Sequence, residues 1–200
     1  MLTLKKVAIT GGLASGKTTA SRFFEELGAY VVNADAIVRE LLRPDTDLGK
    51  QIILLFGSEI VENGKISRRI LAEKAFKDQK QLEKLEELLH PEVIKQIEEL
   101  YSAACKKGIH SSFVVEIPLL FEISADPFYD VTVTVLADEK KAKERFEKAG
   151  FQKMEYDLRM KRHLKPEQKA AKSHYTIHNN GSLEELRSEV VKLNQIIHNQ

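Results

Sequence analysis

Hydrophobic and polar positions along the chain follow two periods that alternate. Short apolar runs rich in β-branched residues are typical of buried strands, and they occur at residues 7–10, 30–32, 113–117, 131–135 and 175–177. Between these runs, apolar residues recur every three or four positions, which is typical of one helix face. Because strands and helices alternate, the pattern predicts an α/β fold, with a parallel β-sheet flanked by helices.

The longest helical stripe runs from Leu82 to Ala104 and contains Pro91. Because proline removes a helical N–H and clashes with the preceding turn, we expect a break or kink near His90. The helical stretch of about residues 58–108 lies between the second and third predicted strands. An insertion at this place of an α/β fold can carry a substrate-binding subdomain, so residues 1–200 are predicted to form a single domain with one helical insertion.

Composition narrows the class of protein. The chain has 200 residues, of which 31 are basic and 30 acidic, so no strong net field favours nucleic acid or a membrane surface. No apolar run approaches the roughly 18 residues of a membrane helix. The single cysteine, Cys105, excludes an internal disulfide and fits a reducing compartment. We therefore expect a cytoplasmic protein with no nucleic-acid or membrane partner.

Residues 11–18 match the pattern G-x-x-x-x-G-K-[ST] of a phosphate-binding P-loop. The motif follows a predicted strand and opens a predicted helix, which is the context that it requires. Gly11, Gly12 and Gly16 allow the backbone to turn tightly around an anion. Lys17 would neutralise the β- and γ-phosphates of a nucleotide, and the Thr18 hydroxyl would coordinate Mg²⁺. The alternative is a glycine-rich turn that binds no ligand.

A second cluster, residues 33–40, follows the second predicted strand. Its position at the carboxyl end of the sheet is where open α/β folds bind ligands. Asp35 and Arg39 are four residues apart and share a helix face. The carboxylate could accept a proton from an attacking hydroxyl, and the guanidinium could hold a phosphate. The two side chains could equally form an ordinary helical ion pair.

Glu116 ends the third apolar run, as the acidic residue of a Walker B motif does. It could orient Mg²⁺ through a water molecule, although aspartate is more usual at this position. Residues 118–122 follow directly and could simply form a buried loop.

Taken together, these segments resemble the dephospho-coenzyme A kinase family. The resemblance extends over nearly the whole chain, in the order that the family shows. The matching segments are residues 10–19, 33–40, 64–68 with Leu71, 89–91, 116–122 and 177–182. The Ala-Asp-Ala-x-x-Arg-Glu and Ile-Pro-Leu-Leu-Phe-Glu sequences are more specific to the family than the P-loop, which many kinases share.

The resemblance implies a P-loop NTPase fold and ATP-dependent phosphorylation of the ribose 3′-hydroxyl of dephospho-coenzyme A, the last step of coenzyme A synthesis. It implies that Asp35 is the general base, with Lys17 and Arg39 also catalytic. Several groups of residues are implied to bind ligands. The ATP site would comprise Gly11, Gly12, Ala14, Ser15, Gly16, Lys17, Thr18, Thr19 and Arg145. The acceptor site would comprise Asp35, Arg39, Arg68, His90, Pro118 and Leu119, and Thr18 and Glu116 would hold Mg²⁺.

The resemblance also implies a helical lid over about residues 139–172 that closes over ATP, with Arg145 as a contact. The chain departs from the family in several places. Ala14 replaces a P-loop glycine, which is tolerable if its φ is negative. Asn33 stands where the family usually has aspartate, and the second lid cation would be Lys148 or Arg162.

Two rival functions remain at this point. Another small-molecule or nucleoside monophosphate kinase would share the P-loop and the lid. A nucleotide-switched binding protein would show no acceptor-dependent turnover, and the Asn-Lys-x-Asp segment of a GTPase is missing from the sequence. We expect a monomer or a weak homo-oligomer whose partner is the small-molecule substrate.

Overall fold

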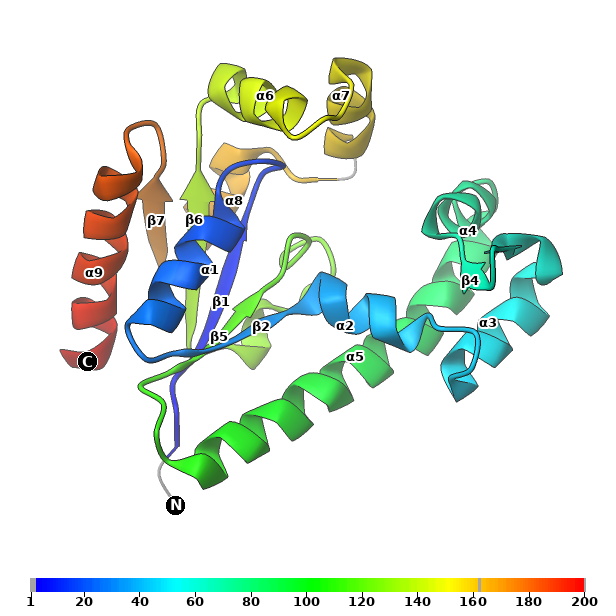
Figure 1. Cartoon of the computed structure of the whole chain (residues 1–200), viewed down its shortest axis with the longest axis horizontal. Coiled ribbons are helices and arrows are strands. Elements are labelled where there is room, and N and C mark those ends of the chain that lie inside the picture. The colour runs from blue at the N-terminus through cyan, green and yellow to red at the C-terminus, as the bar shows by residue number, and fades with distance from the viewer. Residues whose placement is uncertain (1–2, 162, 200) are drawn as a thin grey trace. The chain divides into compact units, whose positions relative to one another are not determined.

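The computed structural model describes residues 3–161 and 163–199, apart from the side chain of Lys153. Its main sheet confirms the five predicted strands: β1 (Lys6–Gly11), β2 (Tyr30–Asn33), β5 (Phe113–Glu116), β6 (Val131–Leu136) and β7 (Tyr175–His178). Their order is β2-β5-β1-β6-β7, and every neighbouring pair is parallel (Figure 1). The predicted α/β fold with a parallel sheet flanked by helices is therefore confirmed.

The helices follow the predicted periodicity closely. They are α1 (Lys17–Glu26), α2 (Ala34–Leu41), α3 (Asp47–Phe56), α4 (Arg68–Ala75), α5 (Gln79–Lys107), α6 (Glu139–Lys148), α7 (Lys153–Met160), α8 (Pro166–Lys172) and α9 (Leu183–Asn199). Short 3-10 helices lie at Ser58–Ile60 and Asp126–Phe128. None of the helices in the described ranges is long and apolar enough to cross a membrane.

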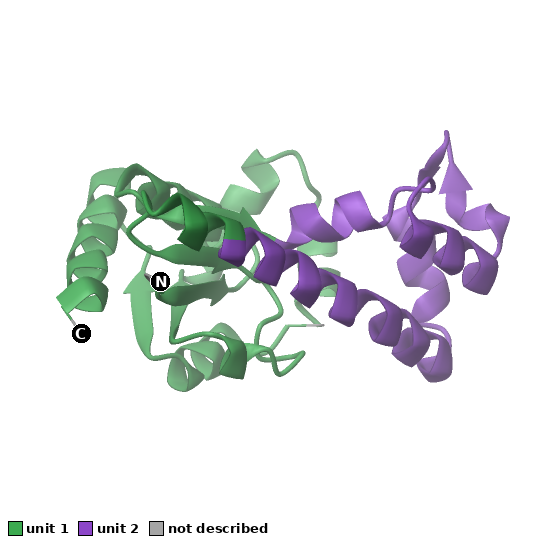
Figure 2. Cartoon of the chain, turned by 90° about the horizontal axis from the view of Figure 1, so that it is seen from below, with its two compact units in different colours: residues 1–33, 103–200 green, residues 34–102 purple. Residues whose placement is uncertain are grey.

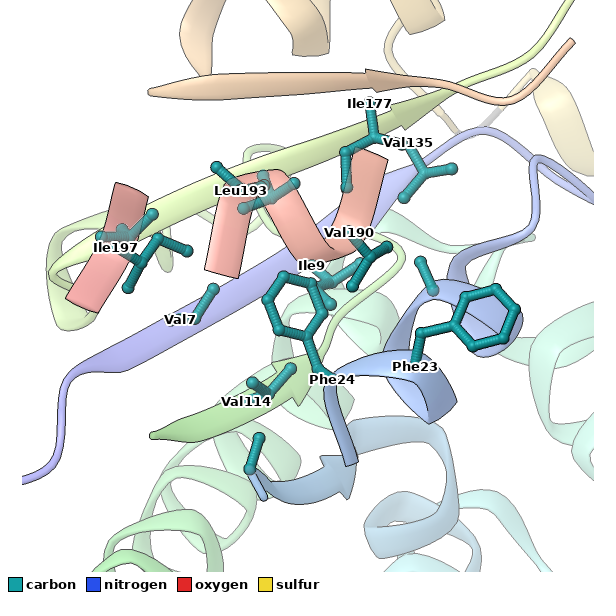
Figure 3. Packing of buried hydrophobic residues seen from close by; sticks show 14 of the residues in the cluster. Val7, Ile9, Phe23, Phe24, Val114, Val135, Ile177, Val190, Leu193 and Ile197 are labelled. Carbon is teal, nitrogen blue, oxygen red and sulfur yellow. The ribbon is translucent and has the colours of Figure 1, made fainter. Parts of the chain in front are cut away.

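The core of the sheet lies under α1 and α9 (Figure 3). Phe23 and Phe24 of α1 pack with Val190 of α9 against strand residues such as Val7 and Ile9. Since side chains alternate along a strand, the opposite face carries Thr10, Val115 and Thr134, and α8 packs there against β1 and β6. Both faces of the sheet are covered, which explains why its strands are almost continuously apolar.

The chain divides into two compact units (Figure 2). The first comprises residues 1–33 and 103–200, and the second comprises residues 34–102. The second unit has a core of its own, in which Leu48, Ile52 and Phe56 of α3 pack with Leu71 of α4 and Leu85 of α5. It also contains a short antiparallel hairpin, β3 (Val61–Glu62) and β4 (Lys65–Ile66), which is too short to show a period in the sequence.

Of the break or kink expected near His90, the break does not occur, because α5 runs from Gln79 to Lys107 with Pro91 inside it. Proline leaves the carbonyl of Glu87 without its helical donor. Pro91 is exposed, so water can reach this part of the helix. Leu85 and Ile97 are buried on either side, and the free energy of burying this apolar stripe offsets the lost hydrogen bond.

Candidate active site

Polar groups gather at the carboxyl edge of the sheet in the first unit. The P-loop follows β1, Asn33 ends β2, Glu116 ends β5 and Asn179 follows β7. The register places Asn33 opposite Glu116, and Gly11 opposite Val135. Because all five strands are parallel, these groups share one edge, which is where open α/β folds bind their ligands.

The P-loop needs glycine for two separate reasons. Gly11 and Gly16 have φ values of 145° and 101°, which L-residues with side chains rarely adopt. A Cβ on Gly11 would lie 2.3 Å from the carbonyl oxygen of Val135, and one on Gly16 would lie 2.1 Å from Nδ2 of Asn179. The loop is thus packed tightly between β6 and the segment after β7.

Ala14 has a φ of +54°, whereas alanine at this P-loop position was expected to be tolerated only with a negative φ. A left-handed conformation costs an alanine roughly 1–2 kcal/mol. The compensation is local: Leu13 and Ala14 pack against a small cluster of Ala142, Phe146 and Tyr156 from α6 and α7. The alanine methyl therefore adds apolar contact that a glycine would not make.

The Lys17 side chain curls back over the P-loop. Its Nζ donates hydrogen bonds to the carbonyl oxygens of Gly12 at 2.7 Å and Gly11 at 3.3 Å, and the residue is buried. The amine is therefore held on the inner side of the loop, where an anion bound by the backbone amides would also lie.

Thr18 and Glu116 form a hard-oxygen pair at the same edge. The Thr18 hydroxyl donates to Oε1 of Glu116 at 2.9 Å, and the Nδ2 of Asn33 donates to Oε2 at 3.2 Å. A hydroxyl and one carboxylate fit Mg²⁺, which takes most of its oxygen ligands from water and phosphates. Among the described residues, no group of three or more His, Cys, Asp or Glu could hold a metal ion by itself.

The contact of Asn33 gives a physical reason for its departure from the family pattern. Its amide nitrogen can donate to Glu116, whereas an aspartate would place a second carboxylate against the first. Asparagine therefore orients the Glu116 carboxylate without placing a second carboxylate beside it.

Arg145 reaches the P-loop through Asn179. Its Nη2 donates to the backbone oxygen of Asn179 at 3.0 Å, and the Asn179 Nδ2 donates to the carbonyl of Ser15 at 2.8 Å. Asn179 is only 6% exposed. The predicted ATP contact Arg145 is thus tied to the predicted ATP-binding loop by one buried asparagine. Residues 177–182 belong to the segments that resemble the family, but no local pattern marks Asn179 for this role.

Replacing Asn179 by alanine should raise the KM for ATP about tenfold, because the change leaves the buried Ser15 carbonyl unpaired and removes the longer contact of Arg145 with Asn179 Oδ1, at 3.4 Å. The KM for the phosphoryl acceptor should change little. The measurement is steady-state kinetics with each substrate varied in turn.

Asn180→Ala is the matched control. Asn180 bonds Asp138 at the exposed start of α6, donating through Nδ2 and accepting through Oδ1. This variant should lose some stability but keep the wild-type KM for ATP. Equal effects of the two alanine variants on that KM would remove Asn179 from the site.

The helices α6 and α7 lie side by side above the P-loop (Figure 1). Lys143 of α6 pairs with Asp157 of α7 at 3.0 Å and with Glu139 at 2.7 Å. A cavity of about 480 Å³ lies between the P-loop and parts of these helices. Its lining includes Gly12, Ser15, Tyr156, Lys161 and Lys165, together with the acidic residues Glu139, Asp157 and Glu167. Its volume suits a small-molecule ligand, and its lining carries charges of both signs.

Tyr156 provides a test of how firmly α7 is packed. Burial raises the pKa of its phenol above the usual value of 10, and the negative charge of Glu139 adds to this shift. As pH rises through 10, the unfolded chain loses the proton while the folded chain keeps it, so stability falls. Tyr156→Phe has no phenol hydroxyl to ionise, so it lacks this fall in stability.

The free energy of unfolding of Tyr156→Phe should therefore improve relative to wild type between about pH 8 and about pH 10.5. Urea unfolding of both proteins at both pH values measures the difference, and the other tyrosines cancel in the comparison. A difference that does not change with pH would show that Tyr156 ionises as freely in the folded chain as in the unfolded one.

Four of the residues predicted to bind the acceptor lie on α2, α4 and α5. Asp35 and Arg39 are exposed in the first and last turns of α2, Arg68 is exposed at the start of α4, and His90 is half-buried in α5. All four belong to the second unit. Within the described ranges, no ion pair joins Asp35 to Arg39, so both side chains are available to a ligand.

Three further predicted contacts lie in the first unit, next to the carboxyl end of its sheet. Pro118 and Leu119 lie in the turn directly after β5, and Thr19 follows Thr18 in α1. Of the two candidates for a second lid cation, Lys148 is exposed at the end of α6, and Arg162 lies outside the described residues.

Comparison with known proteins decides the family. The model of the dephospho-CoA kinase family matches residues 5–185. The chain belongs to the dephospho-CoA kinase family. The dephospho-CoA kinase of Chlamydia pneumoniae is 42% identical over 191 residues, and the alignment covers 95% of each chain.

Two solved structures agree with this assignment. A Thermus thermophilus protein, TT1252, is 27% identical with a TM-score of 0.85, and 98% of each chain is covered. The dephospho-CoA kinase of Campylobacter jejuni is 25% identical with a TM-score of 0.70, and 97% of each chain is covered. The P-loop and the parallel sheet described above are thus those of a phosphate-transferring enzyme of the dephospho-CoA kinase family.

Proposed function

We propose that this enzyme transfers the γ-phosphoryl group of ATP to the ribose 3′-hydroxyl of dephospho-coenzyme A, which gives coenzyme A and ADP. This would be the last step of coenzyme A biosynthesis. The observation that carries the proposal is the meeting of the P-loop, Thr18 and Glu116 at one sheet edge, in a chain of this family. Phosphoryl transfer needs positioning and charge neutralisation more than covalent chemistry, and this edge offers both.

ATP would bind along the P-loop, with its phosphates on the backbone amides of Gly12 to Thr18 and on the α1 N-terminus. Lys17, held over the loop by its bonds to Gly11 and Gly12, would contact the β- and γ-phosphates. Thr18 and Glu116 would hold Mg²⁺, Glu116 through water, and the ion would supply further neutralisation of phosphate charge. Arg145 would contact the nucleotide from α6.

Asp35 is proposed as the general base that accepts the proton of the ribose hydroxyl. It lies two residues after Asn33, so its Cα lies within about 8 Å of the Asn33 Cα whatever the arrangement of the two units. Asn33 is bonded to Glu116, and Glu116 to Thr18. Chain connectivity alone therefore brings Asp35 close to the phosphate-binding edge.

Arg39 would bind a phosphate of the acceptor, one turn along α2 from Asp35. Arg68, His90, Pro118 and Leu119 are proposed as further acceptor contacts. The second unit, residues 34–102, would carry most of these groups as the substrate-binding part of a single kinase domain.

Residues 139–172 are proposed as a lid that closes over ATP. The cavity between the P-loop and α6–α7 supports this role, because its volume of about 480 Å³ suits a small-molecule ligand. Closure would exclude water, which otherwise competes with the ribose hydroxyl for the phosphoryl group.

The test is ADP release from MgATP with and without dephospho-coenzyme A, beside adenosine, AMP and shikimate as alternative acceptors. The proposal expects ADP release that depends on dephospho-coenzyme A and on no other acceptor of the panel. Preference for another acceptor would favour a different small-molecule kinase, and release that ignores all acceptors would favour a nucleotide-switched protein. We further propose that the enzyme works in the cytoplasm as a monomer or weak homo-oligomer.

A further inference from the structure

A buried ammonium group lies in α8, the last helix of the proposed lid region, residues 139–172. Lys169 of α8 is completely buried, and its Nζ contacts Glu122 Oε1 at 2.8 Å and donates to the carbonyl oxygen of Pro118 at 2.5 Å. Both partners belong to the turn after β5, residues 117–125, which we call the acceptor loop because it carries Pro118 and Leu119.

The same carboxylate oxygen also binds the segment that links α7 to α8. The backbone N–H of Leu164, between α7 and α8, donates to Glu122 Oε1 at 2.7 Å. Glu122 therefore connects the acceptor loop to Leu164 in the α7–α8 link, and Lys169 connects the same loop to α8.

The same helix also reaches the P-loop. Pro166, the first residue of α8, packs so closely on Gly12 that a Cβ there would lie 3.3 Å from its Cγ. The Pro118 carbonyl that Lys169 holds also accepts a hydrogen bond from the hydroxyl of Thr10, directly before the P-loop, at 3.2 Å. One short helix thus contacts the segments that are proposed to bind ATP and acceptor.

Stability does not explain this pair well. Burial lowers the pKa of Lys169, which means that the protein environment disfavours the charged ammonium, although Glu122 opposes the shift. A buried ion pair is often no more stabilising than apolar side chains of the same volume, whereas it fixes the relative positions of the groups that it joins. The Lys169–Glu122 pair is therefore better explained by positioning than by stability.

We propose that Lys169 and Glu122 are positioning residues that hold the acceptor loop against α8 and the α7–α8 link, so that the phosphoryl group passes to the acceptor and not to water. This inference rests on the proposed kinase reaction. Without the pair, ATP bound under the lid would meet an acceptor loop out of place. Water would then attack the γ-phosphorus, the bond to the β–γ bridging oxygen would break, and ADP and phosphate would leave without coenzyme A.

The experiment measures ADP and coenzyme A formed in the same reaction by the full-length enzyme. The wild type should give about one ADP for each coenzyme A, and Lys169→Met should give about threefold more ADP than coenzyme A or higher. A variant that is merely less stable would form both products more slowly and keep the ratio at one.

Two further variants complete the test. Lys192→Met is the control, because it also removes one ammonium group, and Lys192 is an exposed lysine of α9 that pairs with Glu189, outside the lid and the acceptor loop. Its ratio should stay at one. The double variant Lys169→Met with Glu122→Gln leaves no unpaired buried charge, so it should fold even if Lys169→Met does not, and it should still be uncoupled.

A ratio of one in the folded double variant would overturn the inference, as would equal ratios in Lys169→Met and Lys192→Met. The wild-type reaction separates this result from the proposed function. Coenzyme A formed by the wild type supports the kinase reaction whatever the variants do, and only the ratios of the variants bear on the positioning pair.

Discussion

Asp35→Asn should lower kcat by on the order of 10²- to 10⁴-fold, the usual contribution of a general base. An asparagine amide keeps the shape of the side chain but cannot accept the proton of the ribose hydroxyl. ATP should still bind with nearly wild-type affinity, because the P-loop, Lys17 and Thr18 are untouched. Rapid-quench measurement of the transfer step, with calorimetry of ADP binding, separates the two effects.

Asp47→Asn is the matched control for this change. Asp47 is also an exposed aspartate in the first turn of a helix, α3, in the same unit as Asp35. Its removal should cost only a few tenths of a kcal/mol through the helix dipole and leave kcat unchanged. A kcat for Asp35→Asn as high as that of the control would exclude Asp35 as the base.

Lys17→Ala should lower kcat by on the order of 10²- to 10³-fold, as the loss of one preorganised donor to a transition state does. The ammonium neutralises charge that grows on the transferring group, so the transition state should suffer more than ground-state binding of ATP. Single-turnover transfer at saturating ATP measures this loss directly.

The Lys17 side chain also bonds the carbonyls of Gly11 and Gly12, so its removal could disturb the loop itself. Binding of ADP by calorimetry controls for this effect, and Lys50→Ala, at an exposed lysine of α3, controls for the loss of charge alone. A wild-type kcat in Lys17→Ala would reject the assigned role.

Local patterns predicted most of the fold. The strands are apolar and β-branched because both faces of the sheet are covered, and the predicted helical stripe from Leu82 to Ala104 lies within α5. Ser182 and Glu185 form the capping box that their spacing predicts at the start of α9. The hairpin β3–β4 was missed because two-residue strands have no measurable period.

Long-range contacts explain what the sequence could not show. Asn179 and Ser15 are 164 residues apart, so nothing local marks the asparagine as a support of the P-loop. Lys169 stands in a charged segment that predicts an exposed helix, yet tertiary packing buries it completely. Ala14 adopts a positive φ because the loop is held from both sides, a constraint that residue type alone does not reveal.

The most direct measurement of the central claim is the mass and the phosphate position of the product formed from MgATP and dephospho-coenzyme A. We expect a product heavier by one phosphoryl group, with the phosphate on the ribose 3′-oxygen by phosphorus–proton NMR correlation, and one ADP for each product. ADP formed equally without the acceptor, no product, or a phosphate at another position would contradict it.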